Sequence, residues 1–192
     1  MINEIENILV IEFFSLPQDE MVKQYNLLRM LKESDMLADK TATKMLMQPY
    51  AVIVNIKKLY ANQTPENITK MVEIVFGLNH LQQMSFNVLS YFPALNFIMN
   101  GIQYISDIET KRLSAPENED LVLAGIHKMR IYGDLNIINL LAGGDVLKWS
   151  EVEKLPYQHI FTKLCMDKDS AEIQENYNEI IRLKNRPDAH SG

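Results

Sequence analysis

Four histidines and one cysteine are the residues best suited to metal binding or nucleophilic chemistry. The histidines are far apart in the sequence: His80, His127, His159 and His190. No two of them have the four-residue spacing that places two imidazoles on one face of a helix. Cys165 lies between Leu164 and Met166, a setting typical of a buried small hydrophobic residue and not of an activated thiolate. These residues therefore predict neither a metal site nor a thiol nucleophile.

The only glycine pair and the acidic clusters also lack the context that catalysis requires. Gly143-Gly144 is not followed by the Lys-Ser/Thr of a phosphate-binding loop, so we interpret it as a tight turn between helices. Asp107 and Glu109 precede Lys111 and Arg112, which indicates a charged, solvated helix face. The sequence contains no Gly-x-Ser-x-Gly motif. We expect no catalytic residue and no cofactor, and therefore no enzyme.

Composition excludes further functional classes. The 192 residues are 47% hydrophobic and 23% charged, as expected for a folded domain. The net charge of −6 and the absence of a basic run disfavour direct nucleic-acid readout. No stretch of about 20 apolar residues predicts a membrane span, and the acidic amino terminus is not that of a secretory signal. The single cysteine fits a reducing compartment.

Helical periodicity dominates the first half of the chain. After Pro17, apolar residues recur at spacings of four and three, which predicts a helix from residue 18 to about 31. Thr64-Pro65 has the pattern of a helix start, and Gly77 of a helix end. The longest candidate runs from 85 to 113. Because Pro93 removes a backbone hydrogen bond, we expect two helices there or one kinked helix, followed by a polar linker at 114–119.

The second half predicts a series of shorter helices. One should extend from about residue 120 to Gly133, and its apolar residues are Leu121, Val122, Ile126 and Met129. Another should extend from 134 to the glycine pair, and Pro156 should open a further helix. Residues 150–153 and 169–172 match the capping box, so a separate last helix should begin near 169. It presents Ile173, Tyr177 and Ile180.

These patterns predict an all-α fold, an irregular bundle of about seven to nine helices. Residues 8–11 and 52–54 are rich in β-branched side chains and are alternative strands, although neither is bounded by hairpin turn signals. We expect a single helical domain over 1–184, with possible lobes at 1–113 and 117–184. Residues 185–192 should form a flexible tail.

Eleven methionines are many for this length. Methionine is flexible, so it fills irregular gaps in a core or forms an adaptable surface for a partner helix. Core filling is the simpler interpretation. The excess nevertheless favours an interaction protein over an enzyme, and it allows a cytosolic regulatory adaptor that binds a partner helix through a Met-rich groove.

Two segments resemble small assembly proteins of tailed bacteriophages. The first is residues 75–78 with the apolar run that follows, QQMSFNVLSYFPALNFIMNGI, and the second spans 132–169. In those proteins a short helix leads to a Trp-bearing turn, and a Leu-Pro-aromatic step then opens a longer helix. Trp149, Leu155, Pro156 and Tyr157 occupy these places here. The resemblance covers about half of the chain and extends equally to tail-assembly chaperones and to head–tail neck ring proteins.

The resemblance implies a non-enzymatic role in binding other virion proteins, in the virion or in the host cytoplasm. It implies phage structural proteins as partners, and assembly as a homo-oligomer such as a closed ring. Trp149, Pro156 and Tyr157 are the candidate contact residues, with Trp149 as the core anchor of its own helix pair as the alternative. Those families have no catalytic residues to transfer.

Overall fold

The computed structural model describes residues 7–116 and 118–185, and the fold is all-α. Helices contain 72% of the described residues and strands 4%. The number of helices is near the predicted range. The one small sheet pairs β1 (Met36–Leu37) antiparallel to β2 (Lys40–Thr41), a hairpin that the sequence did not predict. The alternative strands at 8–11 and 52–54 are wrong, because helix α2 begins at Val10 and helix α4 contains residues 52–54.

The first half of the chain forms a compact body. Its remaining elements are α2 (Val10–Phe14), α3 (Gln18–Leu28), the 3₁₀ helix η1 (Met45–Met47), α4 (Tyr50–Tyr60), α5 (Pro65–Phe76), α6 (His80–Met84) and α7 (Val88–Leu113). The predicted boundaries of α5 are confirmed: Thr64 accepts a hydrogen bond from the amide of Asn67, and Gly77 ends the helix at a φ of 68°.

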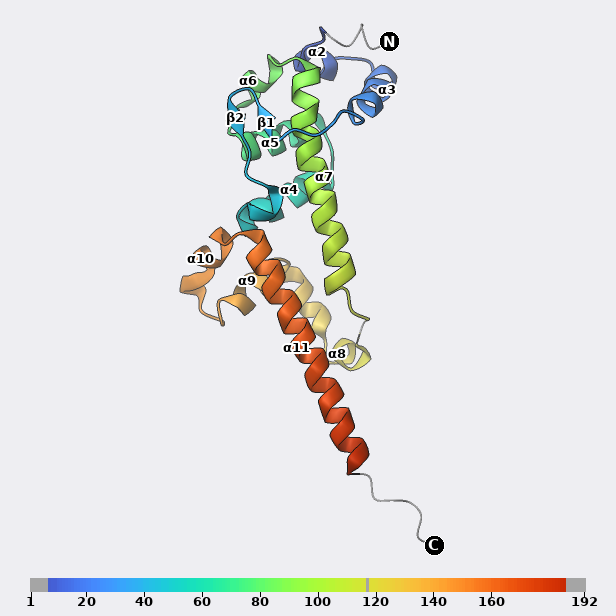
Figure 1. Cartoon of the computed structure of the whole chain (residues 1–192), viewed down its shortest axis with the longest axis vertical. Helices are drawn as coiled ribbons and strands as arrows, with labels where there is room; N and C mark the ends of the chain where they lie inside the picture. Colours follow the sequence, from blue (N-terminus) through green and yellow to red (C-terminus); the bar gives the residue numbers. More distant parts are fainter. Residues whose placement is uncertain (1–6, 117, 186–192) are drawn as a thin grey trace.

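Helix α7 is the centre of the body (Figure 1). The apolar stripe predicted for this helix is Leu95, Ile98, Ile102, Ile105 and Ile108. The first four are fully buried, and Ile108 is half-buried. Of the two possibilities for Pro93, the structure has one continuous helix. Pro93 lies in the second turn, so the hydrogen bond that it removes is close to the amino-terminal end, where helices already lack such bonds.

A buried polar side chain fixes α3 against α7. The Asn96 amide, on α7, donates to the backbone oxygens of Leu28 at 3.1 Å and Leu31 at 2.9 Å. Arg29 donates to the Asn96 carbonyl oxygen at 2.7 Å. Asn96 thus satisfies carbonyl groups that the end of α3 leaves without helical partners.

The second half contains α8 (Glu119–Leu123), the 3₁₀ helices η2 (Ile126–Tyr132) and η3 (Val146–Lys148), and helices α9 (Leu135–Leu141), α10 (Trp149–Lys154) and α11 (Tyr157–Lys184). Only the first part of α11 packs against the body, where Tyr157, Ile160 and Cys165 are buried, the last as expected from the sequence. The helix then continues away from the body toward the carboxyl-terminal end of an elongated molecule (Figure 1).

Three expectations for the second half are wrong. The helix predicted from about 120 to 133 is broken at Gly125, whose φ of 90° is left-handed, and continues as a 3₁₀ helix. Helix α10 begins at Trp149, with no side-chain cap. No helix begins near 169, because α11 passes through 169–172 without interruption. Nothing between Asp167 and Ile173 is a glycine or proline that would stop it.

The described residues end just after α11. Asn185 follows α11 directly, and residues 186–192 of the expected flexible tail lie outside the described residues. Among the described helices, none combines the length and apolar character that a membrane crossing requires.

Candidate protein-binding surface

Exposed apolar side chains are concentrated after residue 118. Most of the buried apolar residues of the described chain come from the first half, whereas most of the exposed large ones come from α8, η2, η3 and α11. The exposed fraction reaches 86% for Leu123, 84% for Leu147 and 80% for Ile131. Single exposed apolar residues are ordinary, but contiguous patches mark interaction sites. The second half is therefore the candidate protein-binding surface.

One part of this surface is hollowed. A groove of about 650 Å³ lies among α8, η2 and α9, and its apolar lining is Leu121, Ile126, Met129 and Leu140. The polar lining residues are Asn118, Arg130, Asn136 and Asn139. We call this the α8–α9 groove. The sequence placed Leu121, Ile126 and Met129 on one helix, whereas in the structure they lie on two elements, α8 and η2. The break at Gly125 leaves two short elements whose apolar side chains have no core to enter.

The other part is the outer end of α11. Ile173, Tyr177 and Ile180 recur at spacings of four and three and share one helix face, with Ile181 and Leu183 beside them. All five side chains are exposed, Ile173 by 69%. We call this face the α11 stripe. The periodicity was predicted from the sequence, and the face is exposed because α11 has already passed the body when it reaches Ile173.

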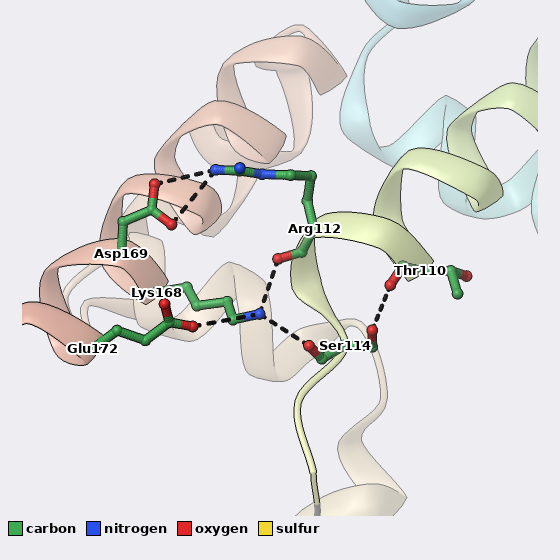
Figure 2. A network of polar contacts seen from close by, with 6 residues as sticks. All are labelled: Thr110, Arg112, Ser114, Lys168, Asp169 and Glu172. Atoms are coloured by element: carbon green, nitrogen blue, oxygen red, sulfur yellow. Dashed lines mark hydrogen bonds and ion pairs between the residues drawn. The ribbon is translucent and has the colours of Figure 1, made fainter. Parts of the chain in front are cut away.

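A polar network holds α11 where it leaves the body (Figure 2). The Lys168 ammonium donates to the backbone oxygens of Arg112 at 3.1 Å and Ser114 at 2.9 Å. It therefore satisfies carbonyl groups at the carboxyl-terminal end of α7, where a positive charge is also favoured by the helix dipole. Arg112 forms an ion pair with Asp169 at 3.1 Å, and Lys168 a second one with Glu172 at 3.6 Å.

A second junction lies at the beginning of α11. The Glu109 carboxylate accepts hydrogen bonds from the Tyr157 hydroxyl and the Lys57 ammonium, which joins α7, α11 and α4. Burial, followed by the hydrogen bond to Glu109, raises the pKa of Tyr157 well above its ordinary value. The Tyr157 phenol is thus held protonated as a donor.

The start of α11 is also paired with the start of α4. Both helices follow a proline, Pro156 and Pro49, and the two prolines form an isolated antiparallel bridge. The Tyr157 amide donates to Gln48 at 2.9 Å, and the Tyr50 amide donates to Leu155 at 2.8 Å. These two bonds satisfy amides that a helix start leaves without helical partners.

The three contact candidates from the sequence have different surroundings. Tyr157 is only 3% exposed and stacks between Tyr50 and Phe161. Pro156 is half-buried in the bridge to Pro49. Trp149 is half-buried against the core, and its Nε1 is buried without a hydrogen-bond partner among the described residues. Tyr157 is thus an internal residue, and the extensive exposed area lies elsewhere, in the groove and the stripe.

Clefts are also present in the first half and at its border. One of about 550 Å³ lies beside α7 and η1. Another, of about 520 Å³, lies between α4 and α9 and contains the Lys58–Asp134 ion pair, 3.2 Å long. No three His, Cys, Asp or Glu side chains of the described residues are grouped as metal ligands. In comparisons with protein-family models, curated proteins and solved structures, no match to the chain was found.

Proposed function

We propose that this chain is a non-enzymatic structural or assembly protein of a tailed phage, which binds other virion proteins through the α8–α9 groove and the α11 stripe. The observation that carries the proposal is the gathering of exposed apolar side chains on these two features. Exposed apolar surface on this scale is costly in water, and a partner that covers it gains the corresponding hydrophobic free energy.

The position of the phage-like segment supports the phage assignment. Residues 132–169 include α9, α10 and the first half of α11, so the segment supplies one wall of the groove and the base of the stripe. A head–tail neck component and a tail-assembly chaperone both bind other phage proteins by such surfaces. Only a neck component remains in purified particles, so mass spectrometry of virions distinguishes the two.

Capture of defined phage proteins tests the proposal. The full chain, carrying an affinity tag, is produced together with the capsid, portal and tape-measure proteins of the same phage genome. We expect it to retain at least one of them. The double variant Ile173→Glu/Ile180→Glu should reduce capture by at least about 30-fold, because each carboxylate would be buried in the contact. Asn178→Glu/Arg182→Glu, on the opposite face of α11, is the matched control.

Equal capture by the stripe variant and the control would contradict the proposal, as would the failure to retain any of the three proteins. The regulatory-adaptor alternative makes a different prediction, namely capture of a replication or transcription protein in place of structural ones. The described residues give little support to the Met-rich groove of this alternative. The cleft beside α7 is lined by only two methionines, Met45 and Met47.

A further inference from the structure

The groove and the stripe are two apolar features of one chain that do not cover each other. The side chain of Leu140 in the groove is 62% exposed, and that of Ile173 in the stripe is 69% exposed. The network of Lys168, Arg112 and Asp169 fixes α11 to the end of α7 just before the stripe begins. Because α11 is a continuous helix, the stripe cannot fold back into the groove of its own chain without breaking it. An occupant must therefore come from another molecule.

A symmetric pairing of two stripes would be too short. From Ile173 to Lys184 the helix has about three turns and a length of roughly 18 Å. Two-stranded coiled coils need about three to four heptads, and this segment contains fewer than two. Such a seam would also leave Leu121, Met129 and Leu140 uncovered. A helix that lies in a groove buries apolar surface of both features at once.

Charge also favours the α8–α9 groove as the binding site of the α11 stripe. Glu172 and Glu179 are seven residues apart, two turns of the helix, so both lie along one edge of the stripe. Arg130 lines the groove, and Lys128 is exposed on the same 3₁₀ helix. An acidic edge thus meets a basic one when the stripe occupies the groove. Two antiparallel stripes would bring like charges together.

We infer that the α11 stripe of one copy occupies the α8–α9 groove of a second copy. This inference rests on the proposed function, since it names the partner for the same surface. Each copy then contributes a helix to one neighbour and a groove to the other. Such a head-to-tail contact adds further copies until rotation closes a ring, or else it continues as an open filament.

Complementation between two defective variants tests the inference. The helix variant is Ile173→Glu/Ile180→Glu, and the groove variant is Met129→Glu/Leu140→Glu. Each should be monomeric alone, because each lacks one half of the contact. Mixed in equal amounts, they should form a dimer and nothing larger, since one intact helix and one intact groove remain. Size-exclusion chromatography with light scattering gives the masses, and circular dichroism shows that each variant is folded.

Surface variants keep the inference testable if a groove substitution prevents folding. Arg130→Glu should weaken self-association by about tenfold, the loss of one charged contact, and mixing with Glu179→Lys should restore part of it. The control Asn178→Glu/Arg182→Glu should assemble normally.

Three outcomes would overturn the inference: a groove variant that self-associates normally, a mixture that stays monomeric, or a wild-type chain that is monomeric throughout. If the monomeric wild type still captures a neighbouring phage protein, the proposed function stands and only the head-to-tail contact is lost.

Discussion

Glu109 is the residue on which three helices converge. It lies on α7 and accepts from Lys57 of α4 and Tyr157 of α11, all at partly buried positions. A carboxylate with two donors at a helix junction is satisfied without a ligand, so its role is structural. Tyr157 extends this junction by stacking on Tyr50. The joint between the two halves of the molecule is therefore specific and rigid.

Removal of the Tyr157 hydroxyl should destabilise the fold without affecting assembly. Tyr157→Phe leaves the ring in place and removes one hydrogen bond to a charged group, so we expect a loss of about 1–2 kcal/mol in the free energy of unfolding. Tyr177→Phe, on the exposed stripe, is the control and should change stability by less than about 0.5 kcal/mol. Urea denaturation measures both, and equal values would show that the hydrogen bond to Glu109 does not contribute.

A substitution at Ile102 tests the packing of α7 in the core. Its side chain is fully buried, so Ile102→Ala should cost about 2–4 kcal/mol through lost burial and the cavity left behind. Ile173→Ala, exposed on α11, should cost less than about 0.5 kcal/mol. If chemical denaturation gave the two variants the same stability, the distinction between a packed first half and an uncovered second half would be wrong.

Among the secondary-structure elements, α7 and η1 pack closely at Gly101. A Cβ at Gly101 would lie 2.3 Å from Cγ and 2.8 Å from Cβ of Met45, on η1. Gly101→Ala should therefore destabilise the protein by about 1–3 kcal/mol, although alanine is the better helix former. Met45→Ala in the same chain should recover part of this loss. A double-mutant cycle by thermal denaturation measures the coupling, and additive effects would show that η1 does not crowd Gly101.

The hydrogen bonds of Lys168 that join α11 to the end of α7 can also be tested. Lys168→Met removes the donor to the Arg112 and Ser114 carbonyls, so we expect a loss of about 0.5–1.5 kcal/mol and faster amide hydrogen exchange in the middle of α11. Lys163→Met removes only an exposed pair with Asp167 and should cost a few tenths of a kcal/mol. Unchanged exchange in α11 would mean that Lys168 does not hold this helix.

Elements whose signals are local could be predicted from the sequence. Thr64, Pro65 and Gly77 determine the two ends of α5, and four of the five stripe residues of α7 are fully buried as expected. The break at Gly125 was missed because a glycine within a helical pattern only weakens it. The short elements α8 and α9 pack against η2 but leave its apolar side chains exposed. The continuation of α11 past residue 169 was missed because Asp169 pairs with Arg112 instead of capping a helix.

The candidate protein-binding surface could not be predicted from the sequence for a related reason. Periodicity identified Ile173, Tyr177 and Ile180 as one helix face, but the direction of that face depends on where α11 leaves the body. That point is set by Lys168, whose backbone partners Arg112 and Ser114 lie 56 and 54 positions earlier in the sequence. Contacts at such separation leave no pattern in the residues that make them. The same holds for Tyr157, whose burial follows from Tyr50 and Glu109.

At the scale of the whole molecule, the chain is packed in its first half and open in its second. The body around α7 supplies stability, and it holds α11 so that the stripe projects beyond it (Figure 1). We propose that this open half contacts other proteins.

Light scattering on the purified full chain tests this proposal. The mass is measured over a range of concentrations, with the chain alone and with the proteins of its neighbouring genes. We expect a mass above the 22.2 kDa of one chain in at least one of these conditions. We also expect a return to that mass in Ile173→Glu/Ile180→Glu but not in Asn178→Glu/Arg182→Glu. A chain that remains at 22.2 kDa in every condition and binds no neighbour would contradict the proposal.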